Sequence, residues 1–121
     1  MAHPVVHWEI GAKDPGRLQA FYGGLFDWQI DTNNPMNYGM VQPGGDGGIG
    51  GGIGAAEGNL PQYVTFYVQV DDLQACLDKA EKLGGKTLVP PSPIPDIGSF
   101  AMFNDPEGNC IGLIQQANPP A

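Results

Sequence analysis

Two residues near the N-terminus, His7 and Glu9, have side chains that can do chemistry. They stand two positions apart in "PVVHWEI", whose alternation of residue types predicts a β-strand, so both point to one face. An imidazole with an ordinary pKa of about 6.5 can give or take a proton at neutral pH. Beside a carboxylate it can hold a substrate proton or a weakly bound metal. His7 and Glu9 are therefore the candidate catalytic residues.

Both residues also have structural interpretations, which the sequence leaves open. A histidine on a strand can be hydrogen-bonded inside the protein, without touching a substrate, or can ligate a metal. A glutamate there can be solvated or salt-bridged. The choice depends on the elements that position the two side chains.

The strand that carries His7 is followed by a helix, and this order occurs twice. Asp14 is the expected N-cap of the first helix, because a proline follows it. The second copy is a strand over 63–70, followed by a helix with Asp72 as its N-cap. The two caps are 58 residues apart (72 − 14), and Thr65 follows His7 by the same offset (65 − 7). A repeat of this kind indicates two similar units that bury their apolar surfaces together.

Each half continues with three further strands, so the chain is α+β. The expected strands are, in order, 27–31, 38–42, a glycine-rich strand around Ile49 and Ile53, 86–90, 99–104 and 110–116. A proline-rich loop is expected between the strands at 86–90 and 99–104. In the two leading strands one face is apolar and is expected beneath the helix. Both helices are expected to lay an apolar stripe on the core.

The opposite face of the leading strands carries Thr65 and Tyr67 as well as His7 and Glu9. Tyrosine and histidine combine an apolar body with a polar tip, so this face indicates a half-buried cup that can hold a small molecule.

Composition excludes several other functions. The 121 residues carry a net charge of −8, which disfavours binding to nucleic acid and to anionic membranes. No apolar run is long enough to span a bilayer, and no signal-peptide pattern opens the chain. Cys76 and Cys110 are expected to be reduced structural thiols, which favours the cytoplasm.

The segment "GGDGGIGGGIG", residues 44–54, contains the spacing of a dinucleotide-binding loop at Gly45, Gly47 and Gly50. Such a loop must open a helix, and no helical stripe follows here. Glycine weakens a strand, so its density indicates that something approaches this backbone closely, either a ligand or a second chain.

Two segments, "HWEIGAKDPGRLQAFYGGLFDW" and "YVTFYVQVDDLQACLDKAEKLGG…FAMFNDPEGNCIGLIQ", resemble the two modules of the vicinal oxygen chelate superfamily. That superfamily contains glyoxalase I, bleomycin-resistance proteins and extradiol dioxygenases. The resemblance implies a single glyoxalase-like domain over 1–121. It implies two βαβββ modules, 1–58 and 59–121, whose eight strands form an open cup.

Metal-using members of the superfamily place four ligands in the cup, one on the first and one on the last strand of each module. Only His7 matches. Thr65 is a poor ligand, Gly112 stands where glutamate is common, and the fourth strand is the glycine run. The resemblance therefore implies a degenerate site that needs no metal. A divalent Fe, Mn, Ni or Zn ion is the alternative.

These observations predict a cytoplasmic small-molecule-binding protein of the glyoxalase/bleomycin-resistance type, working as a homodimer. The ligand-binding residues expected in the cup are Thr65, Tyr67, Gly51, Met102 and Gly112. The alternative is an enzyme of the same fold, a lyase, isomerase or oxygenase that uses His7 and Glu9.

Overall fold

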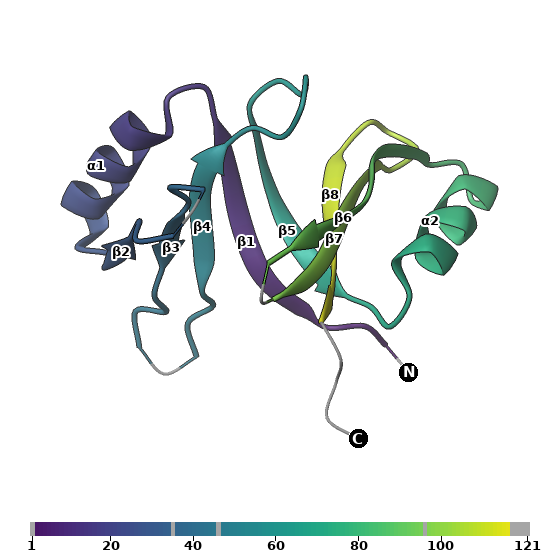
Figure 1. Ribbon diagram of the computed structural model, residues 1–121, viewed down its shortest axis with the longest axis horizontal. Helices are drawn as coiled ribbons and strands as arrows, with labels where there is room; N and C mark the ends of the chain where they lie inside the picture. The colour runs from purple at the N-terminus through teal and green to yellow at the C-terminus, as the bar shows by residue number, and fades with distance from the viewer. Residues whose placement is uncertain (1, 35, 46, 96, 117–121) are drawn as a thin grey trace. The chain divides into compact units, whose positions relative to one another are not determined.

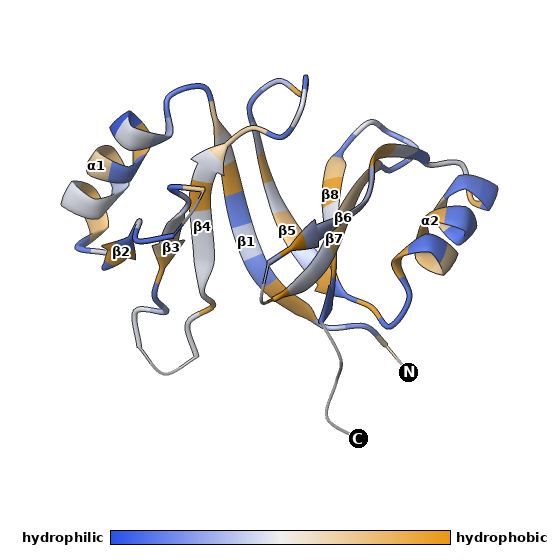
Figure 2. Cartoon of the chain, viewed as in Figure 1, coloured by the Kyte–Doolittle hydropathy of each residue, from blue (hydrophilic) through white to orange (hydrophobic). Residues whose placement is uncertain are grey.

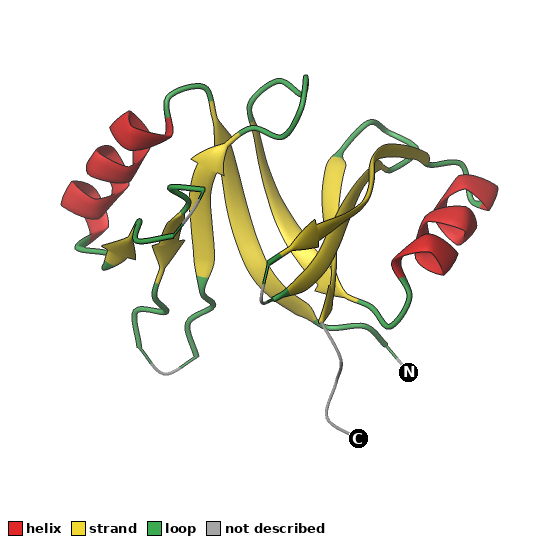
Figure 3. Ribbon diagram, in the orientation of Figure 1, coloured by secondary structure: helices red, strands yellow, loops and turns green. Residues whose placement is uncertain are grey.

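The computed structural model describes residues 2–34, 36–45, 47–95 and 97–116, which divide into two compact units. The first unit is Val6–Thr65, and the second comprises residues 2–5 and 66–116. Each unit carries one helix and its own set of strands (Figures 1 and 3).

In the first unit the chain runs from a strand through a helix into three more strands. These elements are β1 (Val5–Ala12), α1 (Pro15–Phe26), β2 (Ile30–Asp31), β3 (Gly39–Val41) and β4 (Gly51–Ala55). The strand order is β2-β3-β4-β1, in which β1 and β4 run parallel and the other neighbours antiparallel. The parallel pair places β4, the glycine strand, directly beside the strand that carries His7 and Glu9.

The second unit repeats this plan. Its elements are β5 (Tyr63–Gln69), whose first residues belong to the first unit, α2 (Leu73–Lys82), β6 (Lys86–Ile94), β7 (Gly98–Asn104) and β8 (Cys110–Gln116). The strand order is β5-β8-β7-β6, with β5 parallel to β8. Among the described residues the chain thus has eight strands and two helices, and the predicted α+β class with two βαβββ modules is confirmed.

Both predicted helix caps are confirmed. The carboxylate of Asp14 accepts a hydrogen bond from the backbone N–H of Arg17 at 3.2 Å, and that of Asp72 accepts one from Ala75 at 3.0 Å. Each bond satisfies an N–H that the first helical turn leaves without a partner.

The two helices differ in how well they are buried. Leu73 and Leu77 of α2 enter a core with Val70, Ala101 and Leu113. The stripe of α1 contains no fully buried residue (among its members Phe21 is 56% and Leu25 58% exposed), so the expectation that it lies on a core within this chain is wrong. No helix in the described ranges is long and apolar enough to cross a membrane.

The exposed side chains of β5 lie on the face that was expected to be buried. Hydropathy alternates along the strand (Figure 2), but Val64 is 77% exposed while Thr65 and Tyr67 are only 6% and 5% exposed. The prediction that the apolar face lies beneath a helix is therefore wrong for the first half of this strand. Val68, near the end of the strand, does pack against the core that contains Leu73 and Leu77 of α2.

The proline-rich segment is a strand rather than a loop. β6 continues through Pro90, Pro91 and Pro93 to Ile94 and pairs with β7, with register shifts before Val89 and Ser92. Proline lacks the N–H that a central strand needs, but β6 is the last strand in the order of its unit and is bulged. Both features tolerate proline, so the prediction of a loop over this segment is wrong.

Candidate functional site

The parallel pairing of β1 with β4 sets the geometry around the two candidate catalytic residues. Glu9 lies opposite Gly52, and Trp8 lies opposite Gly51. Side chains alternate between the faces of a strand, so His7 and Glu9 share one face and Trp8 takes the other. Gly52 therefore leaves open space on the same face as the Glu9 carboxylate.

The ring of Tyr38 occupies that space. A Cβ added at Gly52 would overlap the ring, and one at Gly54 would lie 2.6 Å from its Cδ1 atom. Tyr63 occupies the equivalent place over Gly11, where a Cβ would also overlap the ring. The glycines are thus needed because two tyrosine rings lie against the bare backbone. The group that approaches the glycine run closely is the chain's own Tyr38.

Both rings bring their hydroxyls to Glu9. Tyr38 donates a hydrogen bond to Oε1 and Tyr63 donates one to Oε2, each at 2.8 Å. Nε2 of His7 lies 2.9 Å from the hydroxyl oxygen of Tyr38. Glu9 is only 6% exposed. We call these four residues, His7, Glu9, Tyr38 and Tyr63, the Glu9 network.

A local turn positions Tyr38 for this role. The side chain of Asn34 accepts hydrogen bonds from the backbone N–H groups of Met36 (3.2 Å) and Tyr38 (2.9 Å). Its amide donates to the backbone oxygen of Tyr38 at 2.7 Å. An asparagine that holds the turn in this way fixes where the following strand begins.

The electrostatics keep both phenols protonated. Burial, and then the negative charge of Glu9, raise the pKa of Tyr38 and of Tyr63 far above the ordinary value. Each phenol therefore remains a donor. Burial and then Glu9 also raise the pKa of the half-buried Glu57, so this part of the first unit disfavours further negative charge.

The protonation state of His7 follows from its partner. Burial lowers the pKa of His7, and the opposing effect of Glu9 is smaller, so the ring is neutral at neutral pH. The single hydroxyl proton of Tyr38 lies in its hydrogen bond to Glu9. The Tyr38 oxygen can therefore only accept from His7, and Nε2 of His7 is the donor. Nδ1 is then the basic nitrogen of the ring.

The predicted ligand-binding residues are distributed over both units. Thr65 is buried in the first unit, and Gly51 lies on the other face of the strand, against the indole of Trp8. Tyr67, Met102 and Gly112 gather in the second unit: Met102 pairs with Gly112 across β7 and β8, and a Cβ at Gly112 would lie 2.6 Å from the Tyr67 ring. Of the residues proposed from sequence, only His7 and Glu9 are joined by the hydrogen bonds of the Glu9 network.

The sequence interpretation missed the two phenols that hold Glu9. Tyr63 falls in the strand expected at 63–70 and Tyr38 in that expected at 38–42, but the sequence links neither phenol to the carboxylate. The usable signal was the glycines at positions 11, 52 and 54, which stand where neighbouring strands would otherwise carry side chains. Glycine in a strand marks a close approach by another group, and a nearby tyrosine was the available group.

The fold is shared with solved structures of one superfamily. A protein of Vibrio splendidus 12B01, described as a glyoxalase/bleomycin resistance protein/dioxygenase superfamily member, is similar over 96% of this chain and 100% of its own, with a TM-score of 0.61 and 16% identity. Methylmalonyl-CoA epimerase of Streptomyces coelicolor is similar over 100% of this chain and 99% of its own, with a TM-score of 0.61 and 13% identity. At such low identity these likenesses establish the fold alone, which is the glyoxalase-like fold that the sequence predicted.

Sequence comparison gives the family. The model of the glyoxalase-like domain matches residues 7–114, and the chain belongs to that family. The putative glyoxylase CFP32 of Mycobacterium tuberculosis (strain CDC 1551 / Oshkosh) is 30% identical over 112 residues, which are 90% of this chain and 42% of that protein. A glyoxylase-like domain-containing protein of Didymella fabae is 32% identical over 108 residues, 84% of each chain. The chain thus spans less than half the length of the mycobacterial relative.

Members of this superfamily often use divalent metals, which need several side-chain ligands close together. The part of the chain that the structure describes contains no group of three His, Cys, Asp or Glu side chains able to hold a metal ion. Both oxygens of Glu9 accept hydrogen bonds from phenols, and the Tyr38 ring covers Gly52 on the neighbouring strand. These residues do not fit a divalent metal site of the superfamily type.

Proposed function

We propose that this chain is a small-molecule-binding protein of the glyoxalase/bleomycin-resistance type, and that its ligand binds at the Glu9 network without a divalent metal. One observation carries the proposal: a nearly buried carboxylate that accepts hydrogen bonds from two phenols, one of which also bonds to a neutral imidazole. This is a set of polar groups held together on an otherwise closely packed face, as binding sites are.

The chemistry of the network favours ligands that donate hydrogen bonds. Glu9 offers acceptor oxygens, and a hydroxyl, amide or amine of the ligand can replace one phenol as the hydrogen-bond donor to them. An anionic ligand would meet the charge of Glu9, and the raised pKa of Glu57 shows that another carboxylate is already disfavoured there. We infer that the ligand is neutral or cationic.

Metal independence has a direct test. The purified protein is incubated separately with Mn²⁺, Fe²⁺, Ni²⁺ and Zn²⁺, desalted, and assayed for metal per chain. We expect far less than one ion per chain with every metal. One ion per chain that His7→Ala abolishes would overturn metal independence while leaving the location of the site intact.

Ligand binding is tested by thermal shift with a library of neutral and cationic small molecules. A ligand present at 100 times its Kd stabilises the protein by about 2.7 kcal/mol. Compounds that shift the wild type should lose most of that shift in Glu9→Gln, which keeps the size of the side chain. Gln74→Glu, at an exposed position of α2, is the charge-changing control. If every hit shifts Glu9→Gln as much as the wild type, the ligand does not bind at this network.

An enzyme is the second candidate, and His7 is the observation that favours it. Its neutral ring, with Nδ1 as the basic nitrogen, can accept a proton beside Glu9. A lyase, isomerase or oxygenase step would then depend on this base. Once a turned-over compound is found, its pH–rate profile should show an ionisation below 6.5 that His7→Gln removes. An unchanged profile would refute this role.

We also propose that the protein forms a homodimer and is located in the cytoplasm. Leu25 and Phe26, at the end of α1, are 58% and 52% exposed, and a second copy of the chain would cover such side chains. Sedimentation velocity distinguishes a dimer from a monomer. Cys76 is a free thiol, as a reducing compartment would keep it.

A further inference from the structure

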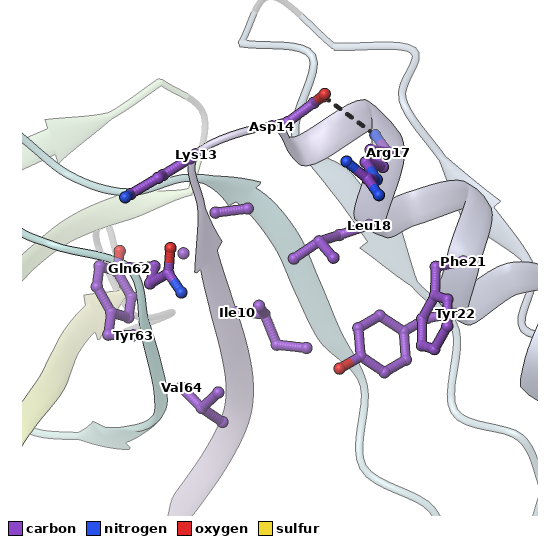
Figure 4. A pocket seen from close by; sticks show the side chains of 12 residues that line it. Ile10, Lys13, Asp14, Arg17, Leu18, Phe21, Tyr22, Gln62, Tyr63 and Val64 are labelled. Atoms are coloured by element: carbon purple, nitrogen blue, oxygen red, sulfur yellow. Dashed lines mark hydrogen bonds between the residues drawn. The ribbon is translucent and has the colours of Figure 1, made fainter.

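A cavity lies in the first unit, beside β1. It is an open groove of about 680 Å³ between α1 and the end of β1, a volume that small ligands occupy in other proteins. Figure 4 shows Ile10 of β1 facing Leu18 and Tyr22 of α1 across this groove. Because Ile10 and Glu9 are adjacent in the strand, their side chains point to opposite faces. Gly11 and Tyr63 also line the groove, so it borders the Glu9 network at the Tyr63 ring.

The walls of the groove are mostly apolar, and much of that surface faces water. Leu18, Phe21 and Tyr22 line it from the helix, and Ile10 and Val64 line it from the strands. Val64 is 77% exposed and Phe21 is 56% exposed. An apolar body placed here would remove these side chains from water, which favours binding.

One end of the groove carries positive charge in an otherwise acidic protein. Lys13 and Arg17 both line it, and they are the only lysine and arginine between positions 6 and 65 of the sequence. Both lie where β1 leads into α1 (Figure 4). Asp14 is also there, and its carboxylate accepts a hydrogen bond from the backbone N–H of Arg17. Two cations and one carboxylate leave one positive charge at this end.

We propose that the groove binds an amphipathic monoanion, an alkyl or aryl carboxylate. The hydrocarbon part lies along Leu18, Tyr22 and Ile10, and the carboxylate lies at Arg17, whose planar guanidinium pairs with a carboxylate through two parallel hydrogen bonds. A single negative charge on an apolar body matches the groove. A polyanion would be repelled by the rest of a chain whose net charge is −8. The proposed contacts involve none of the four residues of the Glu9 network, so the proposal does not require a ligand to bind at that network.

Isothermal titration with three probes of equal chain length tests the headgroup requirement: decanoate, decan-1-ol and decylammonium, each below the concentration at which it aggregates. Decanoate should bind with one site per chain, and at least about tenfold more tightly than the other two, since an ion-paired hydrogen bond is among the strongest polar contacts. Equal binding of all three would mean that only hydrophobicity is recognised, and would overturn the proposal.

Four variants locate the site. Arg17→Gln should weaken decanoate about tenfold. Val64→Asp, at a position exposed enough to accept a charge without unfolding, should abolish binding. Asp14→Asn keeps the helix cap but removes the negative charge, so it should bind decanoate more tightly. Lys82→Gln, on α2 in the other unit, is the control and should bind like the wild type.

Circular dichroism and the thermal midpoint of each variant show whether it is folded, so that a loss of binding can be assigned to the groove. Sedimentation velocity is run on the same samples. A dimer that does not bind decanoate would mean that a second copy covers the groove, which overturns the proposal. Decanoate binding that survives both Arg17→Gln and Val64→Asp would also overturn it.

Discussion

Replacing Gly52 with alanine tests whether the glycine strand exists to admit Tyr38. The new Cβ would overlap the hydroxyl oxygen and the ring carbons of Tyr38, so the ring must move. Tyr38 would then lose its 2.8 Å hydrogen bond to Glu9 and its contact with His7. The substitution adds only one methyl group, but we expect it to destabilise the protein because the Tyr38 ring already occupies that space.

The magnitude follows from three contributions. Losing a hydrogen bond to a charged group costs about 1.5–3 kcal/mol, and forcing an extra methyl into a packed site costs about 1–3 kcal/mol. Alanine is better than glycine in a strand by about 0.5–1 kcal/mol, which offsets part of this. We expect Gly52→Ala to lower the free energy of unfolding by about 2–5 kcal/mol.

Urea unfolding followed by the fluorescence of Trp8 and Trp28, both in the first unit, measures this change. Gly50→Ala is the matched control, because a Cβ there would meet only ordinary contacts, at 3.4 Å from the Val41 oxygen and 3.6 Å from Pro43. It should change the free energy of unfolding by less than about 1 kcal/mol.

A double-mutant cycle with Tyr38→Ala separates the proposed cause from a general intolerance of β4 to side chains. Once the ring is gone, Gly52→Ala should add less than about 0.5 kcal/mol to the effect of Tyr38→Ala. The reasoning is refuted if Gly52→Ala is as stable as Gly50→Ala, or if its full effect persists without the Tyr38 ring.

Two further predictions concern the same network. Tyr63→Phe removes one of the two donors to a nearly buried carboxylate and should lower the free energy of unfolding by about 1.5–3 kcal/mol, whereas Tyr22→Phe should change it little; equal effects in urea unfolding would contradict the role of the Tyr63 hydroxyl. The pKa of Tyr38 and Tyr63 is raised on folding, so the unfolded chain releases protons first as pH rises, and stability should fall above the ordinary tyrosine pKa of 10.0. Urea midpoints between pH 8 and 11 measure this loss, which should be smaller in Tyr63→Phe; an equally steep loss would assign it to other groups.

Local signals in the sequence predicted most of the fold. The last strand is expected at 110–116, which are the bounds of β8, and aspartates before apolar stripes mark the starts of both helices. These features depend on a few neighbouring residues and on the period of the backbone. The proline segment was assigned wrongly for the same reason: a local rule against proline in strands does not reveal that β6 stands last in its unit.

The candidate site was predictable only in part. That His7 and Glu9 share a face follows from alternation alone. The phenols at Tyr38 and Tyr63 come from other elements, 29 and 54 positions beyond Glu9, and their meeting depends on strand register and on the turn at Asn34. Which face of β5 is buried likewise depends on what packs against it from elsewhere in the chain, such as Gly112 against the Tyr67 ring. Neither is encoded in a short stretch of sequence.

The glycine run and the phenols are best understood as one structural change. Gly52 supplies no side-chain donor on the strand beside Glu9, and that same absence lets Tyr38 lie on the backbone and engage the carboxylate. A histidine or glutamate introduced at position 52 would have to displace this ring, and both oxygens of Glu9 would still have to lose a phenol before either could bind an ion. A metal site therefore cannot be restored here by one substitution. It would require changes at position 52, at Tyr38 and at Tyr63 together.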